Sequence, residues 1–185
     1  MPYIKVISEE NAEGELKSIY EEIIKGRGKL SNIMKIHSLY PDSMVKHMDL
    51  YKTLMFAKSG LSRELKETIA VVVSRANECE YCINHHAEAL LFYWKDPEKI
   101  KLIKEDFRKI EFEEKVLSVL KYADKLTREP HKISETDVDK LKDNAWTDDD
   151  ILLINMIVSY FNFVNRIALG LGVEFSEEEM TGYKY

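Results

Sequence analysis

The sequence predicts an all-α protein that folds as one domain over residues 1–185. Apolar residues recur at helical spacing over long segments, and four prolines and seven glycines leave those segments largely uninterrupted. Charged residues make up 32 % of the chain, as expected of helices that each expose a polar face. A chain of this length buries a core without disulfides or metals. We expect about eight helices around a buried helix at residues 62–76 and a last long apolar helix.

Capping residues, prolines and glycines predict where the helices begin and end. The segment Gly26 to Gly28 ends the first helix, and Pro41 opens the next. Asn77 and Glu78 form a tight turn between two helices. Asp96 caps a short helix that begins with a proline, and Thr147 caps the last helix, whose first turn is acidic. The expected helices cover residues 9–25, 41–58, 62–76, 79 onward, 97–106, 111–127, 134–143 and 148–170.

The last helix is apolar almost all round, so it is central or held at a subunit interface. Ser159, Asn162 and Arg166 interrupt it on one side, and we interpret them as hydrogen-bonding groups that fix helix packing or an oligomer contact. An offset of 85 residues aligns this helix with residues 62–76 and places Asn77 opposite Asn162. We therefore expect two related helical hairpins, of which only the first carries chemically active residues.

The two cysteines of the chain form one CxxC motif, Cys79 and Cys82, directly after the tight turn. Backbone N–H groups and the helix dipole stabilise a thiolate there, and CxxC motifs commonly lower a cysteine pKa below its ordinary value of about 8.5. Helical spacing places both cysteines and His86 on one stripe that faces the core. His86 is the neighbour of Cys82 one turn along the helix, whereas His85 is rotated towards the flank.

An acidic residue on the preceding helix completes the candidate site. Glu67 lies on a helix face that is too apolar to be solvated. If the two helices fold back antiparallel, Glu67 comes within about one helical turn of His86. Spacing sets the level of Glu67 along the hairpin but not the direction of its carboxylate, so Arg63, Arg75 and Arg166 remain alternative partners.

These residues follow a pattern: Glu67, eleven intervening residues, the CxxC, three residues and His86. The pattern resembles the active-site signature of the AhpD-like alkylhydroperoxidases in the carboxymuconolactone decarboxylase superfamily. The segments SRANECEYC and SYFNFVNRIALGLGVE are similar to its peroxidase-related branch, and the likeness covers residues 10–175. An acidic tail follows Phe175, and we expect it to be partly disordered. AhpD has a histidine just before its second motif cysteine, where this chain has Tyr81, so that histidine's role in proton relay does not carry over.

The resemblance implies a thiol-dependent peroxidase or related disulfide oxidoreductase. A cysteine thiolate attacks a hydroperoxide, the sulfenic acid condenses with the second cysteine, and an external dithiol or redox protein reduces the disulfide. We assign Cys82 as the attacking residue because His86 is its neighbour, and Cys79 as the resolving, partner-facing residue. Glu67 would orient His86, which would accept the thiol proton. The expected catalytic residues are Glu67, Cys79, Cys82 and His86, with Tyr81 and His85 as secondary candidates.

Two other interpretations of the CxxC stay open. Cys79, Cys82 and a histidine could supply three zinc ligands. The sequence near the motif offers no fourth ligand, and there is no second CxxC. The cysteines could also be inert in a structural or binding member of the superfamily. Haem attachment is excluded because it needs CxxCH, and Ile83 follows Cys82. The favoured interpretation requires no cofactor and no metal.

Composition and charge limit the binding partners and the cellular location that we expect for this protein. A net charge of −6 and a pI near 5.5 argue against a nucleic-acid partner. No apolar run reaches the roughly 18 residues of a membrane-spanning helix, and MPYIKVISEE lacks the core of a signal peptide. We expect a cytoplasmic protein, where reducing thiols favour a redox or metal role of the CxxC over a structural disulfide.

The helix expected at residues 41–58 is rich in methionine and aromatic residues, which we interpret as core or subunit interface. His37 and His47 have no partner at ligand spacing, and we interpret both as surface or packing residues, although a helix that reaches the active site could carry either. The family resemblance implies a homo-oligomer, a trimer or a hexamer. We expect this helix and the last helix to supply part of its interface.

Overall fold

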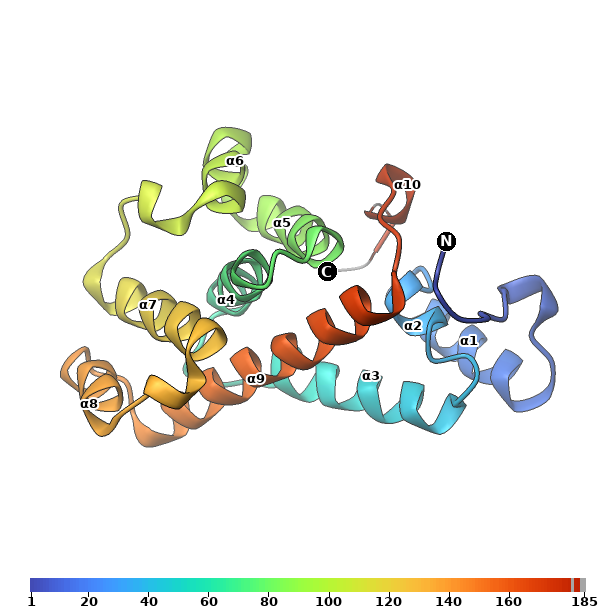
Figure 1. Ribbon diagram of the computed structural model, residues 1–185, viewed down its shortest axis with the longest axis horizontal. Coiled ribbons are helices and arrows are strands. Elements are labelled where there is room, and N and C mark those ends of the chain that lie inside the picture. Colours follow the sequence, from blue (N-terminus) through green and yellow to red (C-terminus); the bar gives the residue numbers. More distant parts are fainter. Residues whose placement is uncertain (181, 184–185) are drawn as a thin grey trace.

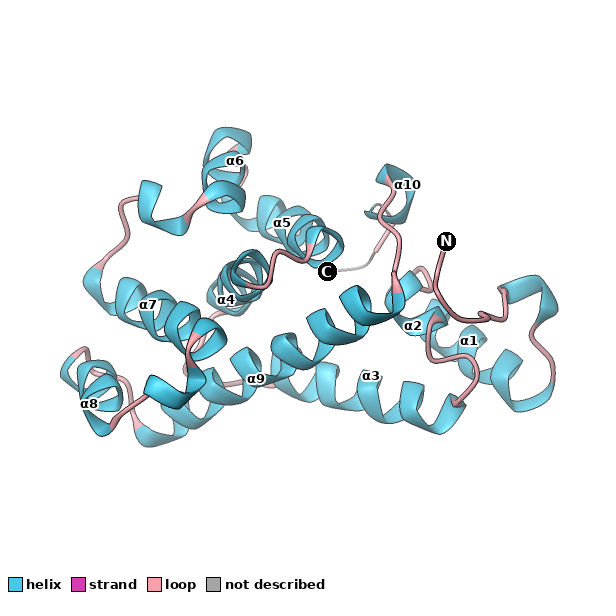
Figure 2. Ribbon diagram, viewed as in Figure 1, coloured by secondary structure: helices cyan, strands magenta, loops and turns pink. Residues whose placement is uncertain are grey.

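The computed structural model describes residues 1–180 and 182–183, and this part of the chain consists of helices and loops without a strand (Figures 1 and 2). The predicted all-α class is confirmed. The longer helices correspond one by one to those that the sequence predicts, and α2 and α10 are four-residue additions. The helices are α1 Gly14–Arg27, α2 Asn32–Lys35, α3 Pro41–Phe56, α4 Arg63–Ala76, α5 Glu80–Trp94, α6 Pro97–Glu105, α7 Glu114–Arg128, α8 Glu135–Asp143, α9 Asp148–Leu171 and α10 Glu177–Met180.

Helix α4 lies at the centre of the fold, packed against α5, α7 and α9 (Figure 1). Ser62 caps it, because the serine side chain accepts a hydrogen bond from the backbone N–H of Leu65 at 3.1 Å. Every residue from 65 to 74 is buried, which confirms that α4 is covered on both sides. Burial of a branched side chain such as Val71 or Val73 contributes about 1.5–3 kcal/mol. This packing fixes the position of the α4 side chains along the helix axis relative to the neighbouring helices.

Helix α9 runs diagonally across the molecule and packs on α4 and α7 (Figure 1). A capping box closes its N-terminus, where the Thr147 hydroxyl accepts from the Asp150 backbone N–H and the Asp150 carboxylate accepts from the Thr147 backbone N–H, both at 3.2 Å. Contrary to expectation, α9 is long and apolar enough to cross a membrane. Half of its most apolar 18-residue window is buried inside the described structure, and a single helix of this length and composition is weak evidence for a membrane span.

Two helices begin later than their apolar periodicity predicts. Helix α1 begins at Gly14 because residues 9–11 form a separate 3-10 turn and Ala12 is extended. Helix α7 begins at Glu114, since Ile110 is extended. Apolar spacing identifies the residues that face the core but not the residue at which helical hydrogen bonding starts.

The alignment at an offset of 85 residues relates two helices, α4 and α9, rather than two helical hairpins. Ser62 and Thr147 are both N-caps, and the matched residues Asn77 and Asn162 contact each other, with the Asn77 amide donating to the Asn162 side-chain oxygen at 3.0 Å. Helix α4 ends at Ala76, but α9 continues through the matching positions, where the Asn162 amide donates to the Val158 carbonyl one turn back. This corrects the expectation of a second hairpin.

The acidic C-terminal tail folds back beside α5 (Figure 1). The Glu179 carboxylate is buried and accepts hydrogen bonds from the Tyr81 hydroxyl at 2.8 Å and from the Asn32 backbone N–H at 2.7 Å. These contacts place the described part of the tail, which the sequence predicts to be partly disordered, against α2 and α5. Residues 181 and 184–185, to which the same expectation applied, lie outside the described residues.

Candidate active site

The candidate site is built on the expected antiparallel hairpin of α4 and α5. Asn77 and Glu78 form its turn, and Glu78 takes the left-handed conformation with a φ of 57°. Cys79 is the N-cap of α5. The Asn77 amide also donates to the side chains of Asn162 and Asn165 on α9, at 3.0 Å each. The turn is therefore anchored to α9, and this anchor positions the CxxC.

Both cysteines are free thiols, and their sulfur atoms lie 2.9 Å apart. At this distance either thiol can donate to the other. Donation by the Cys82 thiol lowers the pKa of Cys79 despite burial, and the Cys82 backbone N–H acts in the same direction. Donation to Cys79, burial and the neighbouring charge raise the pKa of Cys82 well above its ordinary value. Because the two thiols are coupled, the pair loses its first proton as a unit.

This geometry corrects one part of the sequence interpretation. Cys79 occupies the N-cap of α5, where the helix dipole stabilises an anion. Cys79 does not face a partner. It is 1 % exposed, since the turn that carries it packs against α9.

Glu67 is fully buried and bridges the His86 imidazole and the Arg63 guanidinium. One carboxylate oxygen accepts from His86 Nδ1 at 2.7 Å, and the other accepts from Arg63 Nε at 2.9 Å and Nη2 at 2.5 Å. Burial raises the pKa of Glu67, but His86 and Arg63 outweigh it and leave the pKa lowered, so Glu67 is a carboxylate. The expected His86 contact and the alternative Arg63 pairing therefore coexist. Arg75 and Arg166 instead donate to backbone and amide oxygens elsewhere.

The contact with Glu67 sets the tautomer and direction of the His86 ring. A carboxylate only accepts hydrogen bonds, so His86 Nδ1 carries the hydrogen and Nε2 of the neutral ring is left as an acceptor. Phe161 of α9 packs edge-on against the ring, with centroids 4.5 Å apart. His86 lines the same cavity as Cys82, so the ring is held where it could exchange a proton with a reacting group.

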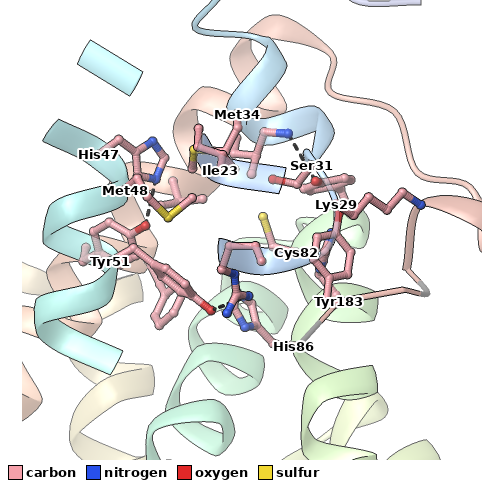
Figure 3. A pocket seen from close by; sticks show the side chains of 17 residues that line it. Ile23, Lys29, Ser31, Met34, His47, Met48, Tyr51, Cys82, His86 and Tyr183 are labelled. Carbon is pink, nitrogen blue, oxygen red and sulfur yellow. Dashed lines mark hydrogen bonds between the residues drawn. The ribbon is translucent and has the colours of Figure 1, made fainter. Parts of the chain in front are cut away.

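A cavity of about 70 Å³ lies between α1, α2, α3, α5 and α9 (Figure 3). Cys82 lines it, whereas Cys79 does not. In Figure 3 the Cys82 sulfur points into this space, with His47 on one side and Tyr183 on the other. Its other walls are mainly methionine and aromatic side chains. The attacking sulfur assigned from sequence is thus the one that a small molecule would reach.

The secondary candidates Tyr81 and His85 also line the cavity, but their polar groups turn towards the C-terminal tail. The Tyr81 hydroxyl donates to Glu179 and accepts from the Ile33 backbone N–H at 3.2 Å. His85 Nε2 lies 3.5 Å from the same Glu179 oxygen. Both residues fasten the tail over the cavity and are placed to shape it.

Sequence reasoning missed Asn165, which is fully buried on α9. Its amide donates to the Ser74 hydroxyl at 3.3 Å, and its hydrogen bond with Cys82 opposes the rise in that thiol's pKa. The available signal was a further amide in an otherwise apolar helix, one turn from Asn162. Asn165 links the CxxC to both α4 and α9.

His37 and His47 are not isolated surface or packing residues. They hydrogen-bond to each other at 3.0 Å, and His47 Nε2 lies 2.7 Å from the Tyr160 hydroxyl. His47 and Tyr160 both line the cavity. No spacing along the chain reveals this cluster, because its members come from three separate segments.

The described residues do not assemble the ligand set that the zinc interpretation requires. Within residues 1–180 and 182–183, no three His, Cys, Asp or Glu side chains are grouped so that they could hold a metal ion. His86 directs Nδ1 to Glu67, and the two cysteines face each other.

The fold and the CxxC hairpin define a class of helical proteins, and comparisons with known proteins identify that class. Residues 41–105 match the carboxymuconolactone decarboxylase family. No curated protein sequence matches the chain. An uncharacterized peroxidase-related protein from Ralstonia eutropha JMP134, described as an alkylhydroperoxidase AhpD core, is 24% identical over 97% of this chain and 94% of its own, with a TM-score of 0.86.

Two further solved structures share the fold. An uncharacterized peroxidase-related protein from Silicibacter sp. TM1040 is 26% identical over 97% of this chain and 91% of its own, with a TM-score of 0.83. A cysteine-to-alanine variant of the debrominase Bmp8, in complex with 2,3,4-tribromopyrrole, is 20% identical over 95% and 92%, with a TM-score of 0.79.

The match of residues 41–105 and the shared fold agree with the resemblance to the AhpD-like carboxymuconolactone decarboxylase superfamily that the sequence signature predicts. The matching family is named for a decarboxylase, and one structure of the same fold is a debrominase, so proteins of this fold are named for different reactions.

Proposed function

We propose that this protein is a thiol-dependent peroxidase, an AhpD-like disulfide oxidoreductase that reduces hydroperoxides with its CxxC pair. The observation that carries the proposal is the position of Cys82. Its sulfur lines a cavity shared with the Glu67-bound His86, and Cys79 lies directly behind it at 2.9 Å. An accessible sulfur, a second sulfur in contact and an oriented imidazole are the parts that disulfide-forming peroxide reduction needs.

The proposed chemistry begins with the pair holding one proton. When that proton lies on Cys79, the Cys82 thiolate attacks the terminal oxygen of the hydroperoxide. A sulfur–oxygen bond forms, the peroxide bond breaks, and the alkoxide leaves with the bonding electrons and takes up a proton. Cys79 then attacks the Cys82 sulfenic acid, and its proton leaves with the hydroxide as water. The products are one disulfide, one alcohol and one water.

Access decides the roles of the two cysteines in this proposal. The pKa of Cys79 is lowered by its contact with Cys82, but the cavity reaches Cys82. Because the two sulfurs are in contact, transfer of one proton between them moves the charge to Cys82 at little cost in geometry. His86 and Glu67 stabilise the protonated imidazole that forms when His86 takes up a thiol proton.

The cavity favours a small substrate. One water needs at least about 10–15 Å³ on a comparable measure, so about 70 Å³ holds a group of only a few non-hydrogen atoms. Hydrogen peroxide and short alkyl hydroperoxides fit this space as it stands.

The test of the proposed function is a mass-spectrometric titration of the purified protein. One equivalent of peroxide should remove two hydrogens per chain by joining Cys79 to Cys82, and a dithiol should restore them. The Cys79→Ser variant, as control, should instead gain one oxygen. An unchanged mass would favour the inert interpretation, and stoichiometric zinc in the native spectrum without a disulfide would favour the metal interpretation.

We also propose a homo-oligomer with the outer face of α9 in its interface. Leu152, Met156, Phe163 and Leu169 of this helix are 61%, 40%, 48% and 47% exposed. The methionines of α3 lie in the core instead, so the contribution of α3 rests on its exposed residues, Leu50 and Phe56. Leu152, Met156 and Phe163 share one face of the helix at its 3.6-residue period, and exposed apolar residues on one face are typical of association surfaces.

Sedimentation velocity at micromolar concentration should show a stable oligomer of the parent protein, a trimer or hexamer. The double variant Leu152→Glu with Met156→Glu should sediment as a monomer, because it places charge in the contact. Leu102→Glu, at an exposed site on α6, should leave the assembly intact. A monomeric parent protein would rule out the oligomer.

We further propose a cytoplasmic location with an external dithiol or redox protein as the reductant. A CxxC pair that must be returned to two thiols after each turnover fits a compartment that supplies reducing thiols. Because both sulfurs are buried, a small dithiol that enters the cavity suits the site better than a protein partner at the surface.

A further inference from the structure

We propose that Tyr160 gives the proton to the leaving alkoxide and that His47 and His37 resupply it from solvent. The proposal rests on the function proposed above and adds a second proton path, separate from His86 and Glu67. It answers a need of the chemistry, because the alkoxide must take up a proton as the peroxide bond breaks and the cysteine pair keeps its own for the second step.

The path is a continuous row of hydrogen bonds from the cavity to the surface. The Tyr160 hydroxyl lies 2.7 Å from His47 Nε2, His47 Nδ1 lies 3.0 Å from His37 Nε2, and His37 Nδ1 lies 2.9 Å from the Ser43 hydroxyl. Tyr160 and His47 are buried, whereas His37 and Ser43 are partly exposed. The row therefore has one end in the cavity and the other near solvent.

Both ends of the row are suitably placed. Tyr160 and Cys82 line the same cavity, and the charge of Cys82 acts on the Tyr160 hydroxyl. The Tyr160 and Phe161 rings lie 5.1 Å apart, and Phe161 packs on His86. Tyr160 and His86 thus contribute separate polar groups to one cavity that contains the reacting sulfur.

The hydroxyl of Ser43 can set the direction in which all hydrogen bonds of the row donate. It donates to the Tyr40 carbonyl at 2.7 Å or turns to donate to His37 Nδ1. In the first state the neutral rings donate outwards and the Tyr160 hydrogen points to His47. In the second state His47 Nε2 donates to Tyr160, whose hydrogen then points into the cavity. A row with two such states can pass protons without burying a net charge.

The pKa shifts of His37, His47 and Tyr160 agree with a role in proton transfer. Burial keeps both histidines neutral near pH 7, lowering the pKa of His37 and taking that of His47 to about 3. Burial and the charges of Tyr51 and Cys82 raise the pKa of Tyr160 well above its ordinary value, so Tyr160 holds its proton until a strong base such as an alkoxide forms beside it.

The test compares two substrates that differ in their leaving group. With tert-butyl hydroperoxide the leaving alkoxide is strongly basic and needs a proton, whereas peracetic acid releases acetate, which needs none. Tyr160→Phe should lower kcat/KM for tert-butyl hydroperoxide by about 10²-fold or more and leave that for peracetic acid nearly unchanged. His47→Gln, which cannot pass a proton onwards, should show the same selective loss to a smaller extent.

Tyr122→Phe is the matched control, because it removes another buried hydroxyl, bound to Asn155 at 2.9 Å, away from the cavity. It should slow neither substrate. Equal losses for both substrates in Tyr160→Phe, or no loss for either, would overturn the relay while leaving the peroxidase intact. A parent protein inert towards both substrates would remove the proposed function itself.

Discussion

Cys82→Ser should reduce peroxide consumption to the uncatalysed rate, because it removes the sulfur that the cavity exposes to the substrate. Cys79 is 1 % exposed and does not line the cavity, so it cannot take over the attack although its pKa is lowered. Serine preserves the size and hydrogen-bonding of the site, and the melting temperature should change little. Stopped-flow measurement of peroxide loss under single-turnover conditions checks the rate.

Cys79→Ser is the matched comparison and should behave differently. Its Cys82 should still consume one equivalent of peroxide and then stop as sulfenic acid, because no second thiol lies in contact to form the disulfide. Peptide mapping after trapping with a sulfenic-acid reagent locates the oxidised sulfur. Oxidation of Cys79 in Cys82→Ser at the rate of the parent protein would reverse the two roles.

Glu67→Gln should slow peroxide turnover by about 10²–10⁴-fold, the range for general acid–base groups, and shift the reactivity of Cys82 to higher pH. Glu67 is a carboxylate whose pKa is lowered by His86 and Arg63, so it favours the positive charge that His86 acquires with a thiol proton. Glutamine is neutral and withdraws that support. Less thiolate then forms at a given pH, and the alkylation profile moves upward. The measurement is the rate of iodoacetamide alkylation against pH.

Two controls separate this effect from damage to the fold. Glu64→Gln removes an exposed carboxylate of α4 that accepts from Trp94 at 2.6 Å, and it should leave turnover and pH profile unchanged. Because Glu67→Gln also weakens the buried contact with Arg63, its melting temperature and helical circular dichroism should be compared with those of the parent protein. A folded Glu67→Gln variant whose alkylation profile superimposes on that of the parent would make Glu67 a structural residue and leave His86 to act alone.

The sequence by itself determined the helical class, the buried nature of α4 and the constellation on the α4–α5 hairpin. These features depend on short-range geometry. Helical periodicity sets which residues share a face, and a tight turn at Asn77 and Glu78 sets which levels of two antiparallel helices meet. The contact between Glu67 and His86 at 2.7 Å follows from such counting once the ring and carboxylate turn towards each other.

Only the tertiary structure decided which groups surround that constellation. Burial of Cys79, the cavity at Cys82 and the row from Tyr160 to His37 depend on how α3, α9 and the tail pack against the hairpin. Spacing within one helix carries no information about the rotation or distance of a helix that is remote in the chain. For the same reason the exclusion of Arg166 as a partner of Glu67 needed the folded structure, whereas Arg63 is the neighbour of Glu67 one turn back on α4. In that structure the fully buried carboxylate is bound by both Arg63 and His86.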